Sequence, residues 1–163
     1  MVYETIPRRK YLELVGAGVA GLAGAGAATA HGTAANYRAH LSALDGLDTD
    51  AQGQATFQLN GHEDELRYRL DVANIDDVLM AHIHLSPSDI VVWLYPADGP
   101  PPSLVEGRVD GVLATGTVTD DDLTGSLGGM GLSDLVAELD AGNAFVRVHT
   151  SEHPAGEIQG DVH

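Results

Sequence analysis

The chain has 163 residues, no cysteine, eight Lys or Arg and 24 Asp or Glu, so its formal net charge is −16. This charge argues against a nucleic-acid-binding protein, because contacts with phosphates need clustered basic side chains. The lack of cysteine excludes disulfide bonds, thiolate metal sites and a lipid-anchored cysteine. The length is sufficient for one domain with a hydrophobic core after a removable leader.

Residues 1–30 have the layout of a secretion signal. Arg8 and Arg9 precede a mildly apolar Gly/Ala stretch, Leu14–Ala27, which small residues follow. A basic region, an apolar region and a small-x-small site are the parts of a cleavable signal. The paired arginines resemble a twin-arginine signal, which exports folded proteins. We expect cleavage after Ala30, no stable membrane span afterwards, and a secreted or cell-surface location.

The remaining chain is strongly acidic. Without residues 1–30 it has five basic and 22 acidic residues, and a net charge of −17. Such a surface repels itself at low salt, whereas molar salt shortens the Debye length to about 3 Å. The composition therefore predicts a salt-adapted source, a halophilic archaeon.

From Asn36 onward the sequence has the pattern of β-strands. Tyr37–Leu44 and Gln54–Leu59 alternate between apolar and polar residues, and Asn60-Gly61 is a strong signal for a two-residue hairpin turn. Leu66–Val72 is the most regular amphipathic strand, in which every second side chain is apolar.

The middle of the chain combines two imidazoles with a long apolar run. His82 and His84 are two residues apart, so a strand would point both at one face and Ile83 at the other. The run Ile90–Tyr95 predicts a second strand that is buried on both faces. We expect the two strands to form a hairpin, with Ser86–Asp89 as its loop.

The second half adds further strands and one helix. Val109–Val118 predicts a strand, and a short helix is expected from an N-cap at Ser133 to a stop at Gly142. Asn143–His149 predicts a strand, followed by a turn and a short returning strand. About seven strands and one short helix favour an all-β fold over residues 36–163, an antiparallel β-sandwich of Ig-like or Greek-key type.

A series of short motifs runs through this region in a defined order. They are His82-Ile-His84, Ile90-Val-Val-Trp-Leu94, Gly116-Thr-Val-Thr119, Asp122-Leu-Thr-Gly125, Leu132-Ser-Asp-Leu135, Ala141-Gly-Asn-Ala-Phe-Val146, Val148-His-Thr150 and Pro154-Ala-Gly-Glu-Ile-Gln-Gly160. The series resembles the CHRD (chordin) domain family over about residues 36–162. The resemblance implies a β-sandwich-like secreted module, and in chordin such domains belong to an extracellular antagonist of bone morphogenetic proteins. We expect the partner to be an extracellular or envelope protein or a glycan.

Three histidines are candidate metal ligands: His82, His84 and His149. His149 ends a strand that could lie beside the His-x-His strand. Three neutral imidazoles on one face suit copper(II) or zinc, and without cysteine the site would contain only nitrogen and oxygen ligands. Three further side chains are candidates to complete or orient the site: His153, Glu157 and Asp89.

A structural role is the alternative for these histidines, and the sequence alone favours it. A histidine in a strand is often a hydrogen-bonded spacer, and His149 could pin the last hairpin near Pro154–Gly156. The His-x-His and the later Val-His are also similar to copper/zinc superoxide dismutase. The bridging-histidine segment and the disulfide cysteines of that enzyme are missing, which disfavours dismutase activity.

No arrangement typical of a catalytic site stands out. Asp120–Asp122 matches no EF-hand spacing and indicates a solvated cap or turn. Glu157 has no second carboxylate at a definable spacing, and the chain has no Gly-x-Ser-x-Gly elbow or phosphate-binding loop. The first hypothesis is therefore an exported, non-enzymatic CHRD protein acting in binding, adhesion or envelope structure. The second is a copper- or zinc-binding or redox protein of the cell exterior.

Overall fold

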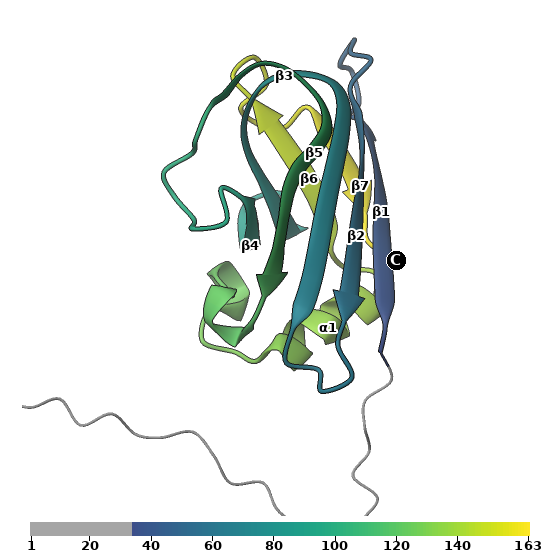
Figure 1. Cartoon of the computed structure of the whole chain (residues 1–163), viewed down its shortest axis with the longest axis vertical. Helices are drawn as coiled ribbons and strands as arrows, with labels where there is room; N and C mark the ends of the chain where they lie inside the picture. Colours follow the sequence, from purple (N-terminus) through teal and green to yellow (C-terminus); the bar gives the residue numbers. More distant parts are fainter. Residues whose placement is uncertain (1–33) are drawn as a thin grey trace, which may run out of the picture. The chain divides into compact units, whose positions relative to one another are not determined.

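The computed structural model describes residues 34–163; the predicted signal, with Arg8, Arg9 and the cleavage site after Ala30, lies outside the described residues. Figure 1 shows strands along most of the described chain, with a helix at one end. The strands are β1 (Asn36–Ala43), β2 (Gln52–Leu59), β3 (Leu66–Ser86), β4 (Asp89–Tyr95), β5 (Val105–Val118), β6 (Phe145–Thr150) and β7 (Ile158–Asp161). The helices are α1 (Leu132–Asp140) and two 3-10 turns, η1 (Asp120–Asp122) and η2 (Gly125–Leu127). Among the described residues, no helix is long and apolar enough to cross a membrane.

The strands pair in an antiparallel, closed circuit. β2 pairs with β1, β1 with β7, β7 with β6, β6 with β3, and β3 again with β2. β4 and β5 also pair with β3. The expected all-β antiparallel fold with one short α-helix is confirmed. The expected sandwich is wrong, because the sheet closes on itself as a β-barrel.

The closure results from the length of β3. The sequence pattern indicated Leu66–Val72 and the strand that carries His82 and His84 as separate strands, but both are parts of one strand of 21 residues. Its first half pairs with β2 and β5, and its second half with β6 and β4. One strand therefore belongs to both halves of the fold. Residues 73–79 concealed this continuity because they contain Asn and Asp, which are depleted in strands.

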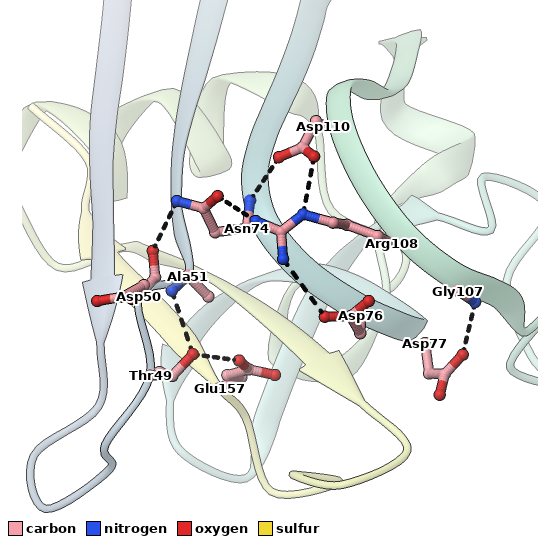
Figure 2. Close-up of polar contacts among 10 residues, drawn as sticks. All are labelled: Thr49, Asp50, Ala51, Asn74, Asp76, Asp77, Gly107, Arg108, Asp110 and Glu157. Atoms are coloured by element: carbon pink, nitrogen blue, oxygen red, sulfur yellow. Dashed lines mark hydrogen bonds and ion pairs between the residues drawn. The ribbon is translucent and has the colours of Figure 1, made fainter.

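β3 bends between its two halves, at Asn74 and Asp77. Their φ angles are +58° and +50°, a left-handed conformation that Asn and Asp adopt more readily than most other residues. Figure 2 shows the polar contacts that hold the bend. The backbone N–H of Asn74 donates to Asp110 (2.7 Å), and that of Gly107 donates to Asp77 (2.6 Å). Arg108 donates to the side-chain oxygen of Asn74 and to Asp110 (3.0 Å).

The β3–β4 hairpin forms as predicted. β3 ends at Ser86 and β4 begins at Asp89, so the connection is shorter than the predicted loop. Val91, Val92 and Leu94 are fully buried in the core, whereas Trp93 is only half-buried. The prediction that this strand is buried on both faces is therefore correct only for part of it.

The helix α1 lies near one end of the barrel and contributes Leu132, Leu135 and Leu139 to the core. Its N-cap is Gly131, not the predicted Ser133. The backbone N–H of Leu132 donates to the carboxylate of Asp120 (2.6 Å), which satisfies one of the free donors at the start of the helix. The acidic run at 120–122 thus has a capping role, as the sequence indicated.

We expect Gly160→Ala to weaken the seam where β7 meets β1. A Cβ at Gly160 would collide with the carbonyl oxygen of His40, so the two strands would have to separate. Overpacking of this kind costs about 1–3 kcal/mol of unfolding free energy, which urea denaturation measures. In the control Gly131→Ala, the new Cβ meets nothing closer than 3.4 Å, so only the weaker N-cap preference of alanine should cost stability and the loss should be smaller. An equal loss in both variants would contradict the steric explanation.

Candidate metal centre

The three candidate ligands lie on adjacent antiparallel strands. His82 and His84 belong to the second half of β3, and His149 belongs to β6, which pairs with that half. Side chains of neighbouring strands that share a face lie close together. Ile83 and Val148 lie in the hydrophobic core, so the histidines occupy the other face of the same strands.

The structure brings the three imidazoles together in a buried cluster. One possible ligand nitrogen from each ring lies within 4.8 Å of the other two. The ring centroid of His82 is 5.4 Å from that of His84 and 5.1 Å from that of His149. Residues His82, His84 and His149 are 0%, 2% and 5% exposed. The sequence predicted this convergence only conditionally, because it depended on which strand paired with β3.

Most ring nitrogens in the cluster have no hydrogen-bond partner. These are both nitrogens of His82, both of His84, and Nε2 of His149. Nδ1 of His149 lies 2.9 Å from the carbonyl oxygen of Pro154; since a carbonyl only accepts, Nδ1 carries the proton and Nε2 keeps a lone pair. The hydrogen-bonded spacer interpretation therefore applies to His149. The backbone of Ser86 acts weakly on His84 and partly opposes the lowering of its pKa, whereas His82 has no such interaction.

The environment keeps all three rings neutral at pH 7. Burial, followed by the charges of His149 and His84, lowers the pKa of His82 to about 3. Burial, followed by the charges of His149 and Arg147, lowers the pKa of His84 to about 4. Burial also lowers the pKa of His149, although its bond to Pro154 opposes this effect. Neutral imidazole is the form that binds metal ions.

Aromatic side chains surround the cluster. The ring of Trp93 contacts that of His82 edge-on, with centroids 4.2 Å apart. Phe145 stacks on His84, with centroids 5.1 Å apart and planes 1° from parallel. The guanidinium carbon of Arg147 lies 5.1 Å from the Phe145 centroid. Neither Trp93 nor Phe145 was among the predicted site residues, although Phe145 shares a strand face with His149 and Trp93 follows in the predicted hairpin.

The comparison with known families agrees with the motif series. The CHRD domain matches residues 37–162, which is nearly all of the described region. The chain belongs to the CHRD domain family. CHRD domains are found in proteins of extracellular type. No curated protein and no solved structure is significantly similar to this CHRD domain.

The three further candidates do not bond the histidine rings of the CHRD domain. Glu157 accepts hydrogen bonds from the hydroxyls of Thr49 (2.7 Å) and Thr150 (2.8 Å). The backbone N–H of His153 donates to the Thr150 hydroxyl (3.1 Å), and Asp89 binds the η2 turn. Asp89 acts on His84 only through its charge, which slightly opposes the lowered pKa of that ring. The Pro154 carbonyl is the group that orients a candidate ligand.

We expect the metal-free CHRD domain to lose stability as the pH falls from about 6.5 to 4. In the unfolded chain the imidazoles protonate near pH 6.5. In the folded chain, His84 and His82 stay neutral until about pH 4 and pH 3. The unfolded state binds more protons in this window. The stability that the neutral, buried rings contribute is therefore fully present above pH 6.5 and is lost as the pH falls below it. A pKa difference of one between the folded and unfolded chain is worth about 1.4 kcal/mol, so the loss should reach a few kcal/mol in urea titrations.

The variant His82→Leu separates this effect from the titration of surface carboxylates. It removes the ring whose pKa is lowered to about 3, so the loss of stability between pH 6.5 and 4 should be smaller. Leucine has no polar atom to leave unpaired, so the variant should be at least as stable as the wild type at pH 7. The same pH dependence in both proteins would show that His82 is not buried in its neutral form.

Proposed function

We propose that this protein is exported and that its CHRD domain binds copper or zinc through His82, His84 and His149. The observation that carries the proposal is the buried set of five ring nitrogens without hydrogen-bond partners. A buried polar group without a partner costs about 1–3 kcal/mol. One metal ion bound by all three rings would satisfy three such nitrogens at once.

The donor set fits these metals. Imidazole nitrogens bind zinc at about 2.0–2.1 Å, so two nitrogens on one ion are at most about 4.2 Å apart. The observed limit of 4.8 Å means that small rotations of the rings would bring them into range. The Pro154 carbonyl fixes the tautomer of His149, a common arrangement around metal-binding histidines. Three protein ligands would leave one position for water or a small ligand.

The site would accept a metal without first losing protons. The lowered pKa values of His82 and His84 mean that both rings are neutral throughout the neutral and mildly acidic range. Metal binding to histidine normally competes with protonation near pH 6.5. This competition would be displaced to about pH 4 here.

A binding or adhesion role outside the cell is the second proposal. It is supported by the CHRD family and by the acidic composition, with a net charge of −16. Its partner would be an extracellular or envelope protein or a glycan, and the surface would suit a high-salt medium. A metal centre and such a role can coexist in one domain.

We expect the protein, purified without a His tag, to bind about one copper or zinc ion per chain. Elemental analysis should detect the ion in the wild type and not in His82→Ala/His84→Ala. Trp93 is the sole tryptophan and contacts the ring of His82, so its fluorescence should change on metal binding. The control His40→Ala removes an exposed histidine and should keep the metal. A folded wild type that binds neither ion would refute the proposal.

We expect Arg8→Lys/Arg9→Lys to abolish export, because the twin-arginine pathway recognises the arginine pair. Fractionation of cells that express the full chain would measure this as accumulation inside the cell. The control Lys10→Arg keeps the basic character of the region and should leave export unchanged. Normal export of the double variant would contradict the proposed route.

A further inference from the structure

The proposed metal centre has no anionic ligand, and Asp89, whose charge acts weakly on His84, is bonded to the η2 turn instead. Its three candidate ligands are neutral imidazoles, and the rings that contact them, Trp93 and Phe145, carry no charge. Nearly all of this cluster is shielded from water. The cost of burying an ion rises steeply with its charge, so a dication without an anionic ligand is much less stable here than a monocation.

A buried cation lies beside the centre. Arg147 is 9% exposed. The region after residue 30 has 22 acidic residues, but the hydrogen bonds of Arg147 go elsewhere. Its guanidinium donates to the side-chain oxygen of Gln159 (2.9 Å) and to the carbonyl oxygen of Ala155 (3.4 Å), both of which are neutral. In the described part of the chain, no Asp or Glu forms an ion pair with Arg147.

The charge of Arg147 acts at short range on the cluster. The guanidinium carbon is 5.1 Å from the centroid of Phe145, and that ring is stacked 5.1 Å from the centroid of His84. The charge is therefore within about 10 Å of a candidate ligand. At this distance and an effective dielectric constant of about 20, each extra positive charge on the bound ion lowers affinity roughly tenfold.

We propose that the three-histidine centre selects copper(I) over divalent ions, and that Arg147 supplies part of this selection. The inference rests on the proposed metal-binding function. Copper(I) adds one positive charge where zinc and copper(II) add two. The described residues bring three imidazoles together, so zinc would need a water as its fourth ligand inside a cluster that is almost closed to solvent. The site is thus built for an ion of low charge and low coordination number.

The test compares affinities for copper(I) and zinc in the full chain. Copper(I) is kept reduced with ascorbate under anaerobic conditions and titrated against a copper(I) chelator; zinc is titrated against a zinc chelator. The wild type should bind copper(I) more tightly, and zinc should not displace it. Arg147→Met should narrow the gap between the two ions about tenfold, and Arg147→Lys, which keeps the charge, should preserve the gap.

A matched control and a second measurement make the outcome decisive. Arg38→Met removes the same charge from an exposed position on β1 and should leave the ratio unchanged. In Arg147→Met the midpoint potential of bound copper should fall by about 59 mV, the equivalent of a tenfold change for one electron. Zinc that displaces copper(I) from the wild type would overturn the inference but leave the metal centre intact. A wild type that binds neither ion would refute the metal centre itself.

Discussion

The continuous strand β3 is the constraint on which the rest of this structure depends. Its first half pairs with β2 and β5, and its second half pairs with β6 and β4. The barrel closes because one strand belongs to both halves. The same strand carries His82 and His84, and its pairing with β6 brings His149 beside them. The bend at Asn74 and Asp77 lets one strand serve both halves.

The two faces of the second half of β3 have opposite energetic roles. Ile83 and the neighbouring apolar side chains of β6 are part of the hydrophobic core, which stabilises the barrel. His82 and His84 on the other face are buried without hydrogen-bond partners, which is unfavourable in the metal-free chain. Functional sites commonly break the rules of stable packing, and the surrounding structure offsets the cost. This unfavourable burial is the observation on which the proposed metal centre rests.

Charge is distributed unevenly between the surface and this cluster. The chain as a whole is strongly acidic, with a net charge of −16. The cluster contains neutral rings, aromatic neighbours and the buried cation Arg147, whose hydrogen bonds go to neutral acceptors. The many surface carboxylates are exposed to solvent and screened by salt, whereas the buried charge is screened much less. The local field at the site can thus differ in sign from the net charge of the molecule.

The sequence by itself determined where most of the β-structure lies, the short helix, the CHRD family and the face on which His82 and His84 lie. These properties follow from local periodicity and motif order, which a linear pattern records. Only the tertiary structure decided that two predicted strands are one, that the sheet closes as a barrel, and that Trp93 and Arg147 lie beside the histidines. These features depend on strand pairing between residues far apart in the chain, such as His82 with Arg147. The free energy of such pairing comes from packing across the whole fold, so no local pattern specifies it.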